Sequence, residues 1–362
     1  MTEQLKLKLN DSKATRWGAL VIVAFTMMAA YYVNDVVAPL KTMLETDLAW
    51  SSTDFGFFTG GYSFLNVFFL MLIWGGLILD RFGIRFTGKL ATILMVGGTA
   101  LEYYAMTGLA GADATLFGIN EIFGYKTGVF VAFAGYSIFG VGAEVAGITV
   151  SKIIAKWFKG KELATAMGVQ VALARIGSQA GYAVAIPLAR AFGISTPVLL
   201  GLVLLLGGMI AFFIFAVMDK KLDKQMEAAA IAAGTEDEEE KFSFKDVKNI
   251  LVNPGFWLIA LLCVLFYSCV FPFQKFASEL MIIKYGINEN VAGTFAGLPA
   301  LGALILTPVF GGFIDKRGKS ASIMLLGSAM LICVHFIYAI PDINYWLVAI
   351  VLMIILGIAF SL

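Results

Sequence analysis

The chain has 362 residues, of which 60% are hydrophobic and only 14% are charged, and its mean hydropathy is +0.87. Soluble globular domains carry about 25% charged residues, so the composition excludes that class and indicates an all-α polytopic membrane protein. The formal net charge of +1 gives no reason to expect a nucleic-acid partner. The expected surroundings are the lipid bilayer.

Apolar runs of membrane-spanning length recur along the whole chain. They cover residues 17–40, 55–79, 86–108, 128–157, 163–188, 195–218, 256–283, 291–314, 320–339 and 345–362. The first run has the length of a span and begins only at Trp17, which is not the pattern of a cleaved signal peptide. Residues 1–16 are therefore expected to form an N-terminal tail.

Lysine and arginine are concentrated in alternate loops between these runs. The basic segments are the tail 1–16 and residues 81–89, 152–161, 220–248 and 316–319. Because loops rich in these cations stay in the cytoplasm, the sequence predicts a cytoplasmic N-terminus.

A glycine-rich charged loop follows the second run and recurs after the eighth. Its candidate residues for a conformational-gating loop are Gly76, Asp80, Arg81, Gly83 and Arg85, with Asp315 and Arg317 in the second copy. Glycine permits a tight turn, so we expect turns at Gly83 and Gly318. A phosphate cradle would need a strand before the loop, which this context lacks. Repeated halves are instead typical of secondary transporters.

Two charges lie deep in neighbouring apolar runs, Glu144 in 128–157 and Arg175 in 163–188. Each is about 18–20 Å from the turn between the runs at about 1.5 Å per helical residue, near the middle of the bilayer. Such charges are costly in lipid and usually face a partner or a wet cavity. We expect an ion pair that lines a substrate path; the alternative is a pair that only ties the two helices together.

Residues 219–254 are predicted to be a cytoplasmic linker, because they contain the acidic run Glu236–Glu240 between lysines. Residues 242–251 alternate apolar and charged positions in a helix-like pattern, which favours a short helix on the inner membrane face. Asn253 and Pro254 mark the start of the next span, since proline fits a first helical turn.

Further polar residues lie in the first, fifth and seventh runs. The candidates for substrate binding, besides Glu144 and Arg175, are Tyr31, Asn34, Asp35, Gln170 and Lys275. Lys275 follows Pro272, which commonly kinks a helix, so this helix could break at a binding site. Alternatively, Lys275 extends to the outer interface and pairs with Glu279.

The sequence offers no catalytic set. The lone His335 and the three cysteines lie in apolar runs, where a core histidine and small hydrophobic thiols are the expected interpretation. No nucleophile, base and orienting group are recognisable. We therefore expect no enzyme activity, no metal site and no cofactor.

The pattern Gly-x-x-x-Asp-Arg-x-Gly-x-Arg at residues 76–85, its weaker copy at 311–319 and the central linker resemble the major facilitator superfamily. That resemblance implies a major facilitator fold with two six-helix halves: residues 17–218, and residues 255–362 with only helices 7–10. Because the chain stops at Leu362 within an apolar run, the resemblance implies that the second half is truncated.

A narrower resemblance is carried by residues 157–163 and by Gly168, Gln170 and residues 174–178. These are similar to the branch that contains the lysosomal dipeptide transporter, in which a glutamate of the fourth helix and an arginine of the fifth contribute to the dipeptide site. The matching residues here are Glu144 and Arg175. The implied membrane is the bacterial inner membrane, or a lysosome-like membrane in a eukaryote.

These observations predict a monomeric transporter of a small solute, best a dipeptide or similar zwitterion, working by alternating access. One alternative is an organic-anion exchanger in which Arg175 and Lys275 bind a carboxylate. Another is a proton-coupled symporter in which Glu144 carries the proton. An alternative of another class is a membrane receptor or assembly subunit that transports nothing.

Overall fold

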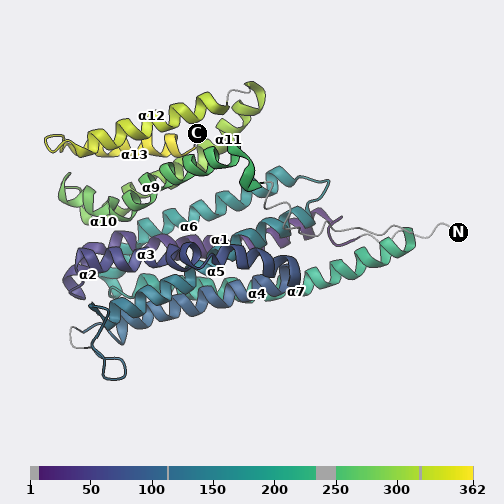
Figure 1. The fold of residues 1–362 in the computed structure, drawn as a ribbon, viewed down its shortest axis with the longest axis horizontal. Coiled ribbons are helices and arrows are strands. Elements are labelled where there is room, and N and C mark those ends of the chain that lie inside the picture. Colours follow the sequence, from purple (N-terminus) through teal and green to yellow (C-terminus); the bar gives the residue numbers. More distant parts are fainter. Residues whose placement is uncertain (1–7, 112–113, 234–249, 318–319, 362) are drawn as a thin grey trace.

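The computed structural model describes residues 8–111, 114–233, 250–317 and 320–361. In this part of the chain it consists of helices and one small β-hairpin, arranged as two groups of helices that lie side by side (Figure 1). The first group contains α1 to α7 and the second contains α9 to α13.

The first group is formed by α1 (Lys13–Val36), η1 (Ala38–Leu40), α2 (Lys41–Asp47), α3 (Ser52–Phe68), α4 (Met71–Thr107), β1 (Glu121–Ile122), β2 (Tyr125–Lys126), α5 (Thr127–Trp157), α6 (Leu163–Phe192) and α7 (Thr196–Ala233). The second group is formed by α9 (Pro254–Ile283), α10 (Glu289–Ala296), α11 (Leu298–Arg317), α12 (Ser320–Ala339) and α13 (Trp346–Ser361). β1 and β2 pair in an antiparallel register, Glu121 with Lys126 and Ile122 with Tyr125.

Six helices of the described part are long and apolar enough to cross a membrane, or seven if the bent pair α3–α4 counts as one span. The predicted run 55–79 is not one helix, because α3 ends at Phe68 and the direction changes by 57° before α4. Leu70, at this bend, has a left-handed backbone conformation with a φ of 52°, which cannot continue a right-handed helix. Helices α6 and α13, also expected to span, fall outside the set of six.

Gly83 marks the predicted tight turn. Its φ of 74° and ψ of 174° break the helical conformation inside α4, and glycine reaches this conformation without the strain that a side chain would add. The predicted turn at Gly83 is confirmed, whereas Gly318 lies outside the described residues.

The linker was predicted to begin at Asp219, and in the structure α7 continues as a helix beyond this residue to Ala233. The residues after Asp219 are rich in Lys, Leu, Gln, Met, Glu and Ala, all strong helix formers. The acidic run and most of the predicted inner-face helix lie outside the described residues. The seventh span starts as expected, with Asn253 accepting a hydrogen bond from the Gly255 amide and Pro254 in the first turn.

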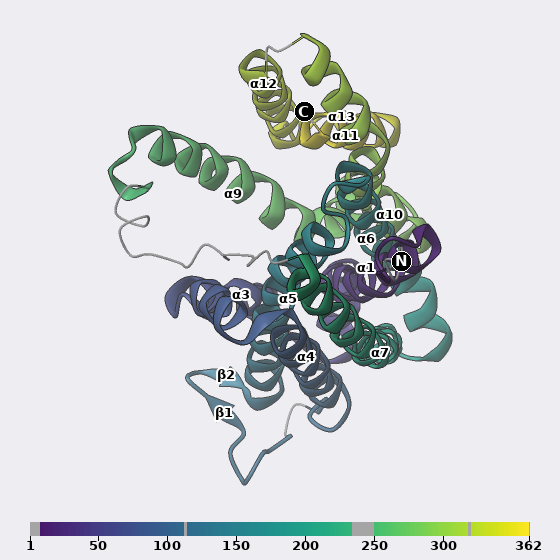
Figure 2. The ribbon, with the colours of Figure 1, turned by 90° about the vertical axis from the view of Figure 1, so that its right-hand side faces the viewer.

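The two groups are in contact at one end of the molecule, which we call the hairpin end and which contains η1, α2, α10 and the β-hairpin (Figure 1); α11 also packs on α6. There α10 packs on α6 and η1, and α9 packs on η1 and α2. The hydrophobic cluster of the second group includes Ala38 and Tyr182 from the first. Toward the other end, which carries the loop between α5 and α6, the start of α9 lies well away from α3 and α5 (Figure 2).

Candidate functional site

Glu144 is positioned by the close packing of α5 on α3. A Cβ atom at Gly140, one turn before Glu144, would lie 2.3 Å from the Tyr62 carbonyl oxygen, so only glycine allows the two helices this approach. The Tyr62 hydroxyl then donates a 2.8 Å hydrogen bond to Oε1 of Glu144. The carboxylate is therefore held by a tyrosine of α3.

Arg175 is positioned in the same way by the packing of α6 on α1. A Cβ atom at Gly177 would lie 2.1 Å from the Met28 carbonyl oxygen. The guanidinium of Arg175 lies over two aromatic rings, 5.6 Å from the centroid of Tyr31 on α1 and 5.0 Å from that of Phe360 on α13. Within the described residues, it has neither a hydrogen-bond acceptor nor an ion-pair partner.

The expected ion pair between Glu144 and Arg175 is thus not formed among the residues that the structure describes. The close approaches near the two charges differ, α5 on α3 at Gly140 and α6 on α1 at Gly177, so each charge has its own aromatic partners. The two still share one region, since Tyr31 is within electrostatic range of both. Glu144 and Arg175 are therefore two separate charged side chains, each within electrostatic range of Tyr31.

Lys275 of α9 crosses to the first group and binds the C-terminal end of α1. Its ammonium donates to the Asn34 carbonyl at 2.5 Å and to the Tyr136 hydroxyl at 3.2 Å, and lies 3.5 Å from Oδ1 of Asp35. The last carbonyls of a helix lack partners within the helix and favour a cation. Asn34, Asp35 and Lys275 are therefore brought together, in contact with each other.

The alternative in which Lys275 reaches the outer interface and pairs with Glu279 is wrong. The Lys275 side chain is only 15% exposed, and Glu279 instead pairs with Lys41 at 2.5 Å. Lys275 and Glu279 therefore each lie next to an oppositely charged residue of the first group, Asp35 and Lys41 respectively. A further ion pair between the groups, Arg190 with Glu289, lies on the surface of the hairpin end.

The remaining predicted residues lie elsewhere. Gln170 is half-exposed on α6 and makes no hydrogen bond in the described part of the chain. In the first loop motif, Asp80 pairs with Lys152 at 2.9 Å, and Arg85 lies 2.5 Å from Asp223. Gly76 has open space around it, and Arg81 lies over the Phe82 ring. The side chains of Asp315 and Arg317 lie outside the described residues.

Asp219, placed in the linker by sequence, is a buried anchor of this motif. It accepts hydrogen bonds from Lys156 at 2.8 Å and from the Trp157 indole at 3.0 Å, and Arg85 approaches it at 3.4 Å. The motif therefore ties α4, α5 and the extension of α7 together.

Sequence reasoning missed Tyr62, Tyr136 and Phe360, and it assigned no role to Glu102, which is fully buried. Tyr136 precedes Glu144 by two helical turns, so helical periodicity places both on one face of α5 and could have identified it. Tyr62 and Phe360 carry no such signal. Neither carboxylate oxygen of Glu102 has a hydrogen-bond partner in the described part of the chain.

The N-terminal segment is fixed to the loop between α5 and α6. Arg16 binds Glu162 with N–O distances from 2.8 to 3.2 Å, and this hydrogen bonding lowers the pKa of the Glu162 carboxyl from its ordinary value of 4.5. Lys161 pairs with Asp11 at 2.8 Å and lowers the pKa of that carboxyl in the same way.

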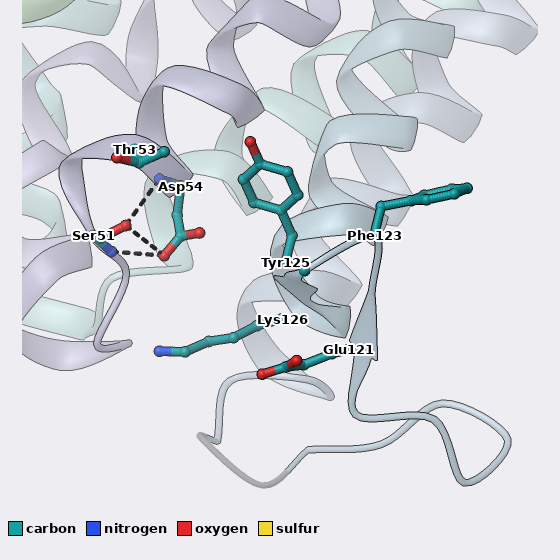
Figure 3. A pocket seen from close by; sticks show the side chains of 8 residues that line it. Ser51, Thr53, Asp54, Glu121, Phe123, Tyr125 and Lys126 are labelled. Carbon is teal, nitrogen blue, oxygen red and sulfur yellow. Dashed lines mark hydrogen bonds between the residues drawn. The ribbon is translucent and has the colours of Figure 1, made fainter.

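An open pocket at the hairpin end holds none of the predicted residues. Figure 3 shows it between the start of α3 and the β-hairpin, with Glu121, Phe123, Tyr125 and Lys126 on the hairpin side. On the other side, Ser51 and Asp54 bind each other's backbone amides in a capping box that starts α3. Its polar groups serve the local fold, so we assign it no ligand.

Comparison with protein families matches the chain to the Major Facilitator Superfamily over residues 19–362. Curated relatives include the human lysosomal dipeptide transporter MFSD1, 27% identical over 96% of this chain and 71% of the relative, and the Bos taurus protein of the same name, 25% identical over 96% and 70%. A Gallus gallus relative is 31% identical over 63% of this chain and 51% of its own length.

Solved structures share the fold. A D-xylose–proton symporter superposes with a TM-score of 0.61 at 16% identity, covering 95% of this chain and 80% of the symporter. Tetrameric PepTSo2 gives a TM-score of 0.63 at 12% identity, over 95% and 81%. A bacterial homologue of the human lysosomal transporter Spinster, crystallised inward-facing and occupied, gives 0.61 at 15% identity, over 97% and 73%.

Proposed function

The chain belongs to the Major Facilitator Superfamily, and on that premise we propose that it transports dipeptides or similar small zwitterions by alternating access. Membership of this superfamily shows that the chain is a multi-pass membrane transporter. The substrate class and the residues that bind it are the proposal.

The observation that carries this proposal is the unpaired state of Arg175. Its guanidinium is held between two aromatic rings, with its N–H donors free of acceptors in the described part of the chain. A guanidinium presents donors in a rigid planar fork that matches a carboxylate. A cation placed in a membrane span and left without an anion is best explained by an anionic group that the substrate supplies.

Glu144 supplies the opposite charge. One of its carboxylate oxygens is fixed by Tyr62, and Tyr31 lies within electrostatic range of both charges. A dipeptide carries an ammonium at one end and a carboxylate at the other, and charge-assisted hydrogen bonds to both ends are strong. The names of the curated relatives support the same substrate class.

Asn34, Asp35 and Lys275 fit a different role, which is to close the hairpin end. All three acceptors around the Lys275 ammonium come from the first group, so separation of the groups at this end must break the contact. With the positive-inside orientation, the hairpin end faces the periplasm or lumen, and this state has that end closed.

An organic-anion exchanger would use Arg175 together with Lys275. The donors of Lys275 are already directed at Asn34, Tyr136 and Asp35, which favours the zwitterion over a dianion. Proton coupling is a separate property, tested by measuring uptake with and without an imposed pH gradient.

The decisive experiment is uptake of labelled Ala-Ala into vesicles that contain the purified protein, with empty vesicles as the blank. Competition by N-acetyl-Ala-Ala, Ala-Ala-amide and a dicarboxylate then tests each charge. We expect the free dipeptide to compete best, Glu144→Gln and Arg175→Gln to lose uptake, and Arg190→Gln, an exposed arginine on the same helix, to retain it. Absence of uptake across a dipeptide panel would overturn the proposal.

A further inference from the structure

The charged residues near the site all come from the first group of helices. Glu144 lies on α5 and Arg175 on α6. From the second group, α13 has no charged residue, and the charges of α9 are confined to Lys275 and Glu279, which both bind the first group at the hairpin end. Helices α9 and α13 therefore present an uncharged surface to Arg175.

That surface is aromatic. Phe360 of α13 lies against the Arg175 guanidinium at 5.0 Å, and Phe266 of α9 stacks on Phe360 with ring centroids 6.1 Å apart and an interplanar angle of 21°. Tyr267 contacts Phe266 edge-on at 5.7 Å and is 45% exposed. We call Phe266, Tyr267 and Phe360 the aromatic wall.

The position of the aromatic wall next to Arg175 indicates which part of a bound dipeptide would contact the wall. A carboxylate bound to Arg175 brings the Cα of the same residue next to the guanidinium, and the guanidinium lies over the Phe360 ring. The side chain on this Cα therefore lies beside the wall, whereas the N-terminal residue extends toward Glu144. Aromatic and apolar side chains gain most from such a surface, because rings pack edge-on or offset and lose contact with water.

We propose that the aromatic wall receives the side chain of the C-terminal residue of a dipeptide, so that the transporter selects for an apolar or aromatic residue at that position. This inference rests on the proposed function and deepens it. It makes the two groups of helices unequal: the first binds the charged termini, and the second selects the C-terminal side chain.

The test is competition against uptake of labelled Ala-Ala by Ala-Ala, Ala-Phe, Phe-Ala and Ala-Asp. In the wild type we expect Ala-Phe to inhibit at about tenfold lower concentration than Ala-Ala, with Phe-Ala and Ala-Asp weaker than Ala-Phe. In Phe266→Leu the ratio of the inhibiting concentrations of Ala-Ala and Ala-Phe should fall toward one while Ala-Ala is still transported. Phe336→Ala, which removes an exposed ring of α12, is the matched control and should keep the advantage.

Phe266→Leu is the critical variant, because in the described part of the chain the rings that Arg175 lies over are those of Tyr31 and Phe360 and not that of Phe266, and leucine keeps the helix packed. An unchanged Ala-Phe advantage in this variant, or equal inhibition by Ala-Phe and Phe-Ala in the wild type, would overturn the inference while dipeptide transport still stands. No Ala-Ala uptake by the wild type would overturn the proposed function and the inference with it.

Discussion

The Tyr62 hydroxyl donates a 2.8 Å hydrogen bond to Oε1 of Glu144, so the partner of this intramembrane carboxylate is a tyrosine of α3. We expect Tyr62→Phe to weaken the apparent affinity for a dipeptide about tenfold, because a hydrogen bond to a charged group contributes about 1.5–3 kcal/mol. The concentration dependence of uptake measures this. Tyr104→Phe, an exposed tyrosine of α4, is the control; equal affinities in both variants would exclude the role given to Tyr62.

Exchanging the two midplane charges tests whether they touch. Removal of one member of a buried pair costs about 3–5 kcal/mol, and a swapped pair should recover it. Because Glu144 and Arg175 have separate neighbours here, we expect Glu144→Arg combined with Arg175→Glu to remain both destabilised and inactive. Thermal unfolding and uptake measure this, and recovery of both properties would show that the charges serve as a structural tie.

The ion pair of Lys41 with Glu279 should hold the hairpin end closed. The Lys41 side chain is only 2% exposed, so Lys41→Met leaves the carboxylates of Glu45 and Glu279 without their cation and should cost about 3 kcal/mol or more. Adding Glu279→Gln should restore part of the loss in melting temperature. The exposed pair of Arg190 with Glu289 is the control, and its removal should cost at most about 1 kcal/mol. Similar losses for the two pairs would contradict the proposed closure.

Glu102 offers a test of a buried carboxyl that lacks hydrogen-bond partners in the described part of the chain. A buried polar group without a partner stabilises nothing by hydrogen bonding and is costly when ionised. We expect Glu102→Gln to change stability by no more than about 1 kcal/mol and to retain uptake, in contrast to Glu144→Gln. Loss of uptake at normal stability would reveal a proton or ligand site at Glu102.

The contact of Arg16 with Glu162 should make stability depend on pH in the acidic range. The folded protein lowers the pKa of the Glu162 carboxyl from its ordinary value of 4.5. Its stabilisation is therefore present above that value and is lost as the pH falls through the lowered pKa. The measurement is the melting temperature of each protein between about pH 7 and pH 3, expressed relative to its value at neutral pH. Below pH 4.5 this relative melting temperature should fall less steeply in Arg16→Gln than in the wild type.

Lys159→Gln is the matched control for that comparison, because Lys159 is an exposed cation of the same loop that makes no ion pair in the described residues. It should keep the acid dependence of the wild type. If melting temperature depends on pH in the same way in Arg16→Gln and the wild type, the contact of Arg16 with Glu162 does not cause the acid dependence.

Several features were predictable because they depend on local sequence. Hydrophobic run length identifies membrane spans, so the all-α membrane class followed from composition and spacing. The turn at Gly83 followed from the loop pattern, and the start of α9 followed from Asn253 and Pro254. The cost of charge in lipid marked Glu144 and Arg175 as residues that need a partner, whatever that partner is.

The choice of partner depended on tertiary structure, because it is set by which helices approach each other. Gly140 allows α5 to pack on α3, and Gly177 allows α6 to pack on α1. These approaches place Glu144 within hydrogen-bond distance of Tyr62 and Arg175 over the ring of Tyr31. Residues far apart in sequence, Asn34 and Lys275, meet only when the two groups close at the hairpin end. Sequence periodicity fixes the face of a helix on which a charge lies, but the three-dimensional packing determines the residue that faces it.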